Sequence, residues 1–194
     1  MNNASSIPPE KPVAPPAGGF AAPPLALDHA SRWQRLLAYR LLLVLALVVY
    51  ALDQLTKYWI AARLPYPTFA ESDGAIRVIR NFFYLTHVGN TGAAWSLFTG
   101  RSVLLGSLAA LTLVAIFLWR HTLGLRARMP QICFGLLCGG IAGNLTDRLA
   151  RGHVVDFIDL HFGSYVYPTF NIADSGICVG VLLYLWFSLR NSSP

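Results

Sequence analysis

Residues 36–61 read LLAYRLLLVLALVVYALDQLTKYWIA, an apolar run that carries two opposite charges, Asp53 and Lys57, in its second half. A helix of about 20 apolar residues is long enough to cross the hydrocarbon layer of a membrane, which is about 30 Å thick. The chain has further apolar runs at residues 102–119, 130–149 and 172–189. We therefore predict an all-α membrane protein with four transmembrane helices.

The composition of the 194 residues supports this class of protein. Hydrophobic residues make up 55% and charged residues only 12%, whereas a soluble domain has about 25% charged residues. A conventional cytosolic enzyme is therefore disfavoured. The net charge of +6 comes from basic residues that flank the apolar runs, so we predict no nucleic-acid partner. The cysteines lie in apolar runs without C-x-x-C spacing, and we predict no disulfide, metal or cofactor.

Arginines set the predicted orientation. Residues 1–30 are rich in Pro and Ala and are predicted to be a disordered tail, followed by a membrane domain at residues 31–190. Arginines follow this tail, crowd the connection between the second and third runs, and follow the fourth run at Arg190. By the positive-inside rule both termini are cytoplasmic. The first run is then an anchored helix rather than a cleaved signal peptide.

Two loops are predicted to face the periplasmic side of a bacterial membrane. The loop at residues 62–101 contains segments 76–79 and 82–88, which are rich in β-branched and aromatic residues. This composition predicts a small β-rich subdomain on the membrane surface. In the second loop, residues 153–160 are apolar and carry Asp156. We expect that segment to lie along the membrane surface or to dip into it.

Small and ionisable residues mark the helix contacts. Gly135, Gly139 and Gly143 recur at a spacing of four in the third run, a pattern that lets helix backbones approach closely. Ionisable groups inside a membrane span cost several kcal/mol unless they are paired or functional. Because successive spans alternate in direction, all the polar groups of the spans lie toward the outer ends of the helices. These groups are Asp53, Lys57, Asn144, Asp147, Arg148, Asn171 and Asp174.

Each of these groups also has a purely structural interpretation. Asp53 and Lys57, at positions i and i+4, can form a self-neutralising ion pair. Asp147 and Arg148 can close the third helix in the headgroup region, and Asn171 with Asp174 matches an N-cap followed by an acid in the first turn. Asp156 can be a solvated interfacial acid. The number of polar groups on one face nevertheless exceeds what capping and neutralisation require.

Five segments, taken in order, resemble the lipoprotein signal peptidases (signal peptidase II), which are bacterial inner-membrane aspartyl proteases. The resemblance covers about residues 36–189, and Trp95 stands where the family usually has Phe. The segments are DQLTK at 53–57, NTGAAWS at 90–96, GGIAGNLTDR at 139–148, GHVVDF at 152–157 and FNIADS at 170–175.

The resemblance implies a function and a role for each site residue. The catalytic pair would be Asp156 and Asp174. The substrate would be a prolipoprotein whose lipobox cysteine bears a diacylglyceryl group, cleaved on the amino side of that cysteine. We predict a monomeric protein whose partners are this substrate and membrane lipids. Asn90, Asn144, Arg148 and Asn171 would line the substrate pocket, and Asp53, Lys57 and Asp147 would support it.

Other functions remain as alternatives. A proton-coupled transporter also places acids among helices, but such proteins usually show internal repeats and polar groups at the membrane midplane. In a non-catalytic scaffold Asp156 and Asp174 would be replaceable by Asn. Presenilin-like and prepilin-type proteases carry a G-x-G-D motif and many serine hydrolases a G-x-S-x-G motif, and the chain contains neither.

Overall fold

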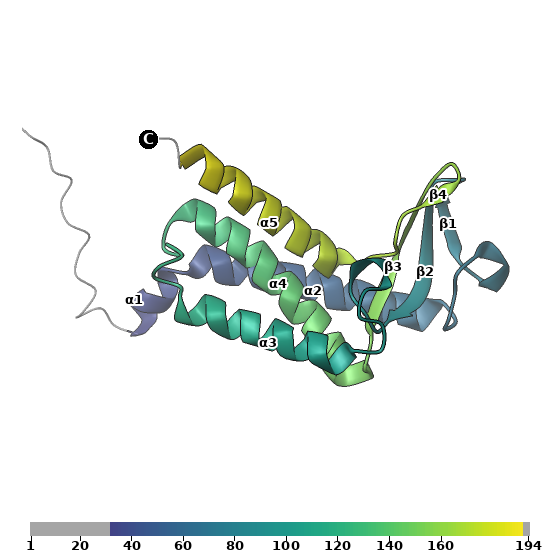
Figure 1. The fold of residues 1–194 in the computed structure, drawn as a ribbon, viewed down its shortest axis with the longest axis horizontal. Helices are drawn as coiled ribbons and strands as arrows, with labels where there is room; N and C mark the ends of the chain where they lie inside the picture. Colours follow the sequence, from purple (N-terminus) through teal and green to yellow (C-terminus); the bar gives the residue numbers. More distant parts are fainter. Residues whose placement is uncertain (1–31, 192–194) are drawn as a thin grey trace, which may run out of the picture.

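The computed structural model describes residues 32–191, so the predicted disordered tail at residues 1–30 lies outside the described residues. Within that range the chain forms a bundle of helices with a small antiparallel sheet at one end (Figure 1). A short helix, α1 (Arg32–Leu37), precedes the bundle. The long helices are α2 (Arg40–Arg63), α3 (Ser102–Leu118), α4 (Arg128–Arg151) and α5 (Ile172–Asn191).

The four long helices occupy the four predicted apolar runs, with one difference at the start of the first. We predicted a helix from residue 36, but the backbone of Tyr39 is not helical (φ −112°, ψ 14°), and α2 begins at Arg40. By length and hydropathy α2 and α5 are candidate membrane spans, whereas α3 is apolar but has 17 residues. The predicted helices are therefore present, and the crossing of a membrane by all four stays a prediction.

The sheet is built from both loops rather than from the first alone. Its strand order is β1-β2-β3-β4, and all neighbouring strands are antiparallel. The first loop provides the predicted small sheet segment, and the second loop provides the central strand β3 and the edge strand β4. The strands are β1 (Ile76–Ile79), β2 (Phe83–Asn90), β3 (Val154–Phe162) and β4 (Tyr165–Val166), with short 3₁₀ turns at η2 (Glu71–Asp73) and η3 (Ala94–Ser96).

Residues 153–160, which we expected to lie along the membrane surface or to dip into it, form most of strand β3. This strand pairs with β2 so that Val88 lies opposite Asp156, and its position relative to the membrane stays a prediction. Successive side chains of β3 point to opposite faces of the sheet, so each face of the strand has its own surroundings. Val155 and Phe157 pack on one face in a buried cluster with Ile60 of α2 and Leu64, which follows α2, whereas Asp156 faces a cavity on the other side.

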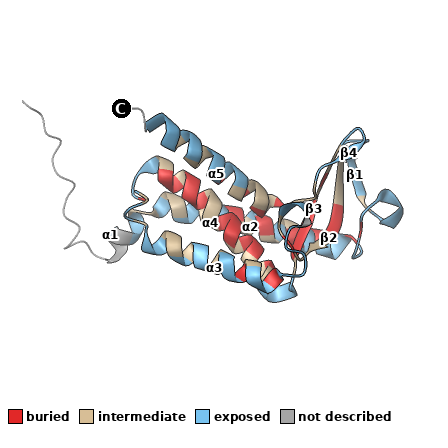
Figure 2. Cartoon of the chain, in the orientation of Figure 1, coloured by how far each residue is buried: buried red, intermediate tan, exposed pale blue. Residues whose placement is uncertain are grey.

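Helix α4 is the centre of the bundle and contacts α2, α3 and α5. Figure 2 shows buried positions concentrated on α4 and where the helices meet the sheet, while much of α3 and α5 is exposed. The exposed residues are largely apolar: Leu104 on α3 is 49% exposed and Leu182 on α5 is 60% exposed. An apolar exterior of this kind suits a lipid environment.

Glycines allow α4 to approach α2 closely, as the spacing of Gly135, Gly139 and Gly143 predicted. A Cβ atom on Gly139 would lie 2.6 Å from the carbonyl oxygen of Ala46 on α2. A Cβ atom on Gly143 would overlap the carboxylate of Asp53. The predicted close packing of this face is therefore confirmed, and α2 is the helix that it contacts.

We expect Gly139→Ala to lower the free energy of unfolding by about 1–3 kcal/mol, because the added methyl group must displace the backbone of α2. Gly106→Ala on α3 is the matched control: its Cβ atom would lie 3.8 Å from the nearest neighbours. That variant should be neutral or stabilised by up to about 1 kcal/mol. Thermal melting in detergent measures both, and equal melting temperatures of the two variants would contradict the close contact.

Candidate active site

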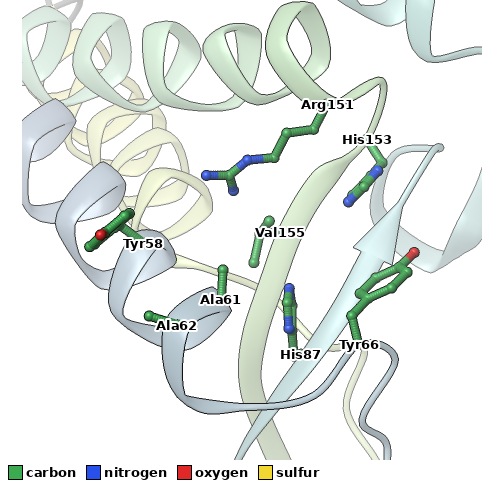
Figure 3. Close-up of a pocket in the computed structure, with 8 residues that line it drawn as sticks. All are labelled: Tyr58, Ala61, Ala62, Tyr66, His87, Arg151, His153 and Val155. Carbon is green, nitrogen blue, oxygen red and sulfur yellow. The ribbon is translucent and has the colours of Figure 1, made fainter.

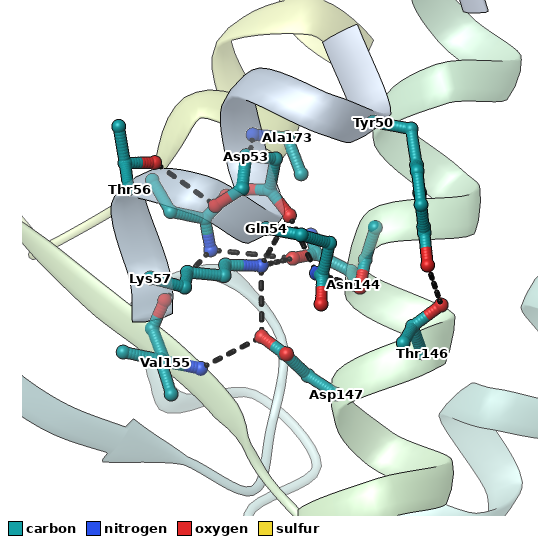
Figure 4. Close-up of polar contacts among 12 residues, drawn as sticks. Tyr50, Asp53, Gln54, Thr56, Lys57, Asn144, Thr146, Asp147, Val155 and Ala173 are labelled. Atoms are coloured by element: carbon teal, nitrogen blue, oxygen red, sulfur yellow. Dashed lines mark hydrogen bonds and ion pairs between the residues drawn. The ribbon is translucent and has the colours of Figure 1, made fainter. Parts of the chain in front are cut away.

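A buried lysine organises the polar residues at the sheet end of the bundle. The side chain of Lys57 is fully buried, and its ammonium group lies 2.8 Å from Asp53 Oδ2 and 2.8 Å from Asp147 Oδ2. It also donates to Asn144 Oδ1 at 2.9 Å (Figure 4). These acceptors match the three donors of an ammonium group. The predicted ion pair of Asp53 with Lys57 is confirmed, and Asp147 contacts the same lysine from α4.

A second cation and backbone amides complete this network, in which one lysine faces two buried carboxylates: Arg151 Nη1 lies 3.6 Å from Asp147 Oδ1. Asp53 Oδ1 accepts a hydrogen bond from the amide of Ala173 at the start of α5 (2.9 Å). Asp147 Oδ2 accepts one from the amide of Val155 on β3 (3.1 Å). The network therefore joins α2 and α4 to the two segments that carry Asp156 and Asp174.

The lysine also fixes how the amide of Asn144 is oriented. An ammonium group can only donate, so the oxygen of Asn144 must face Lys57 and its nitrogen must face away. That nitrogen donates to Asp174 Oδ1 at 2.7 Å. The amide of Asn171 is oriented in a similar way, because its oxygen accepts from the backbone amide of Asp174 (2.9 Å) and its nitrogen donates to Asp156 Oδ1 (2.7 Å). Each asparagine thus holds one carboxylate.

Asn171 and Asp174 form a reciprocal cap at the N-terminus of α5. The side chain of Asn171 accepts from the amide of Asp174, and Asp174 Oδ2 accepts from the amide of Asn171 at 3.2 Å. This pattern is a capping box with an aspartate in place of the usual glutamate. The predicted N-cap is therefore present. It also fixes the Asp174 carboxylate, whose other oxygen receives the hydrogen bond from Asn144.

Asp156 is the more buried of the two carboxylates, at 3% exposure. Burial raises the pKa of its carboxyl group to about 7, and the negative charge of Asp174 acts in the same direction. Hydrogen bonds from Asn90 and Asn171 and the charge of Lys57 partly oppose this rise. The Asn90 nitrogen lies 2.9 Å from Asp156 Oδ2. A carboxyl group with this pKa can hold a proton at neutral pH.

Both carboxylates line one cavity of about 640 Å³. Three of the predicted pocket residues, Asn90, Asn144 and Arg148, line it as well. The fourth, Asn171, is fully buried behind the carboxylates and is not part of the cavity wall. The rest of the wall is mostly apolar and aromatic, and it includes residues that the sequence analysis did not single out: Leu160, Tyr167, Phe170, Ile177 and Val179.

Arg148 connects this cavity to the loop after β2. Its Nη2 donates to the carbonyl oxygen of Gly92 at 2.9 Å, and the side-chain oxygen of Asn90 accepts from the amide of Gly92 at 2.8 Å. The Nε of Arg148 is buried and has no hydrogen-bond partner among the described residues. Within residues 32–191 no group of three or more His, Cys, Asp or Glu side chains is arranged to hold a metal ion.

Comparisons with known proteins agree on one family. Residues 45–190 match the family model of signal peptidase (SPase) II. The chain is 38% identical over 142 residues to the lipoprotein signal peptidase of Bacillus subtilis (strain 168), which covers 72% of this chain and 87% of that protein. It is 38% identical over 156 residues to that of Nostoc punctiforme, covering 79% and 92%. A solved structure described as a bacterial membrane enzyme superposes with a TM-score of 0.70 at 32% identity, covering 78% of this chain and 89% of that one.

We expect Lys57→Met to lower the free energy of unfolding by about 3–5 kcal/mol, because it leaves two carboxylates buried without their shared cation. Asp53→Asn should also destabilise, and the variant with both substitutions should recover part of the loss. Thermal melting in detergent measures each variant.

The exposed ion pair of Arg77 with Glu71, whose side chains are 50% and 47% exposed, provides the control. Glu71→Gln should change stability by less than about 1 kcal/mol. If Lys57→Met melts at the same temperature as Glu71→Gln, the buried network does not stabilise the fold as described.

Proposed function

The chain belongs to the signal peptidase II family of lipoprotein signal peptidases, and from this premise we propose that it is an aspartyl endopeptidase with Asp156 and Asp174 as its catalytic pair. The family makes it a protease that removes signal peptides from lipoproteins. The proposed substrate is a diacylglyceryl-modified prolipoprotein, cleaved on the amino side of its lipidated cysteine. The single observation that supports the pair best is that both carboxylates line one cavity and are held there by neighbouring amides.

The two carboxylates differ in the contacts that bear on their protonation. Asp174 lies at the N-terminus of α5 and accepts from a backbone amide there, an arrangement that stabilises negative charge. Asp156 has the pKa raised to about 7 by burial and by the charge of Asp174. We therefore assign the shared proton to Asp156 and the ionised state to Asp174.

This assignment gives a water-based mechanism. Ionised Asp174 takes a proton from a water molecule, whose oxygen forms a bond to the scissile carbonyl carbon. Protonated Asp156 donates to the carbonyl oxygen, which yields a tetrahedral intermediate. When the carbon–nitrogen bond breaks, the proton held by Asp174 passes to the leaving amine, and Asp156 recovers its proton from the intermediate as the acid product forms.

The remaining cavity residues suit an extended, lipidated substrate. The guanidinium of Arg148 lines the cavity and uses only two of its five N–H groups on the backbone oxygens of Asn144 and Gly92, which leaves donors for a substrate carbonyl or ester oxygen. The apolar wall includes Ile177 and Val179 on α5, a candidate membrane span, and can contact acyl chains. Each buried methylene group contributes about 0.8 kcal/mol. Asn144 and Asn171 are fully engaged with the carboxylates and Lys57, so we assign them to positioning the pair rather than to binding the peptide.

The proposed location in the membrane follows from the arrangement of the helices and the sheet. We propose a multi-pass protein of the bacterial inner membrane, with all four long helices crossing it, both termini in the cytoplasm and the catalytic cavity near the periplasmic face. The arginines of the connection between α3 and α4 lie at the end of the bundle opposite the sheet (Figure 1). The positive-inside rule places that end in the cytoplasm. The proposed enzyme acts as a monomer.

The catalytic pair is tested by substitution. We expect Asp156→Asn and Asp174→Asn each to lower the cleavage rate by about 10²–10⁴ or more, because an amide can neither take the proton of water nor share one. The assay follows the gel shift of a purified diacylglyceryl-modified prolipoprotein in detergent. An unlipidated precursor run beside it should remain uncleaved.

Asp159→Asn is the matched control, because Asp159 lies on the same strand, is also buried, and pairs with His161 away from the cavity. This variant should keep wild-type activity. The proposed pair is wrong if Asp156→Asn or Asp174→Asn retains more than about a tenth of the wild-type rate.

The proton on Asp156 predicts a pH profile. Its pKa is raised from 3.8 to about 7, so the acid form is present below that pH and is lost as pH rises through it. We expect kcat/KM to fall above about pH 7, and the Asp159→Asn control to show the same descending limb. A profile that stays flat to pH 9 would contradict the acid role of Asp156.

The raised pKa also has a consequence for stability. The folded state binds this proton more tightly than the unfolded state, so the contribution of Asp156 to stability falls as pH rises between 3.8 and about 7. Asp156→Asn removes the ionised group that causes the loss. Its melting temperature at pH 8 should therefore equal or exceed that of the wild type, and a large decrease would show that the carboxylate is needed for folding.

The orientation is tested by cysteine-accessibility labelling in intact cells, on a background in which Cys133, Cys138 and Cys178 are replaced. An impermeant reagent should label cysteines placed at Asp73 and Ser164 and should not label those placed at Arg126 and Arg190. Labelling of the Arg126 position from outside would reverse the topology.

A further inference from the structure

We propose that a second cavity, on the opposite face of the sheet from the catalytic cavity, binds the phosphate group of an anionic membrane lipid. This cavity has a volume of about 440 Å³ and lies where the ends of α2 and α4 meet the sheet (Figure 3). Strand β3 separates the two sites. Val155 faces the second cavity, whereas its neighbours Val154 and Asp156 face the catalytic one.

Arg151 supplies the positive charge of this site. It is the last residue of α4, and its side chain is 33% exposed. Within the described residues its ion pair is with Asp147 at 3.6 Å, a carboxylate that already contacts Lys57 at 2.8 Å. Among residues 32–191 the guanidinium makes no hydrogen bond, and Figure 3 shows it reaching over Val155 into the open space. A guanidinium with free donors matches the geometry of a phosphate group.

Three rings around the space add hydrogen-bonding groups. His87 is held by a contact of its Nδ1 with the carbonyl oxygen of Leu64 at 3.1 Å. Since a carbonyl only accepts, Nδ1 carries the proton and the Nε2 of the neutral ring is an acceptor, which suits a headgroup hydroxyl rather than a phosphate oxygen. His153 stacks on Tyr66 with ring centroids 5.6 Å apart, and in the described part of the chain neither ring has a hydrogen-bond partner. The Tyr66 hydroxyl and the His153 ring can each donate to a phosphate oxygen.

The apolar side of the cavity favours a lipid over a soluble anion. Tyr58 and Ala61 line it from the last turns of α2, which is a candidate membrane span. Tyr58 is 69% exposed and the adjacent Trp59 is 44% exposed, and aromatic side chains of this kind concentrate at the membrane–water interface. A glycerol backbone bound at Arg151 would therefore have its acyl chains beside the lipid-facing surface of α2. The inference rests on α2 crossing the membrane and not on the catalytic pair.

The test is a binding measurement on the full-length protein in neutral detergent, so its outcome does not depend on peptidase activity. Calorimetric titration compares dihexanoyl phosphatidylglycerol with dihexanoylglycerol, which lacks the phosphate, and with inorganic phosphate, which lacks the lipid. We expect saturable binding of the phosphatidylglycerol, with the other two ligands at least about tenfold weaker.

Arg151→Gln should weaken phosphatidylglycerol binding by about tenfold or more, because a charged hydrogen-bonding partner of the phosphate is lost. Arg128→Gln, at the other end of the same helix and exposed, removes the same charge and should bind within about twofold of the wild type. Ala61→Leu fills the cavity without changing charge and should also weaken binding. The Ala61→Leu variant therefore tests the site even if Arg151→Gln does not fold.

Two results would overturn the proposal. Arg151→Gln and Ala61→Leu variants that bind phosphatidylglycerol as tightly as Arg128→Gln would show that the lipid does not occupy this cavity. Inorganic phosphate binding as tightly as the lipid, and lost in Arg151→Gln, would assign the cavity to a soluble oxyanion instead.

Discussion

The buried ammonium group of Lys57 is the constraint from which the rest of the polar architecture follows. A charge without solvent contact must be paired and hydrogen-bonded on all sides, and Lys57 meets this need with groups from α2 and α4. The same contacts depend on packing, because Asp53 occupies the space that Gly143 leaves open between these helices. Electrostatics and close packing therefore specify one arrangement of α2 against α4.

The orientation of side-chain amides carries this constraint to the proposed catalytic pair. Lys57 fixes the amide of Asn144, which holds Asp174, while Asp174 and Asn171 cap α5 together. Capping and catalysis are therefore not alternatives at this position. The carboxylate of Asp174 helps to cap the N-terminus of α5, and it is also the group that we propose as the base. Asp156 does not lie at a helix terminus. It is buried on β3, where two asparagines donate hydrogen bonds to its carboxylate.

The sequence predicts the helices well because their apolar runs must be buried in lipid or protein, and it predicts that their polar residues meet because successive helices alternate in direction. It does not predict strand β3, since the partner of that strand comes from the other loop and a short apolar segment also suits a membrane surface. The sequence also does not predict the aromatic wall of the catalytic cavity, because its residues come from segments far apart in the chain. Trp95, which the sequence marks only as part of the segment at 90–96, lies in that wall with an unusual backbone conformation (φ 54°, ψ 32°).

The spacing of Asp53 and Lys57 has a consequence for biosynthesis. In the proposed four-span topology α2 enters the bilayer before α4 and α5 are made, so its lysine then has no contact with Asp147 or Asn144. Asp53, one turn away on the same helix and 2.8 Å from the ammonium group, is the only acidic partner that is already synthesised within α2. A neutral pair within one helix lowers the cost of inserting that helix alone. When α4 follows, Asp147 and Asn144 contact an ammonium group that entered the membrane already paired with Asp53.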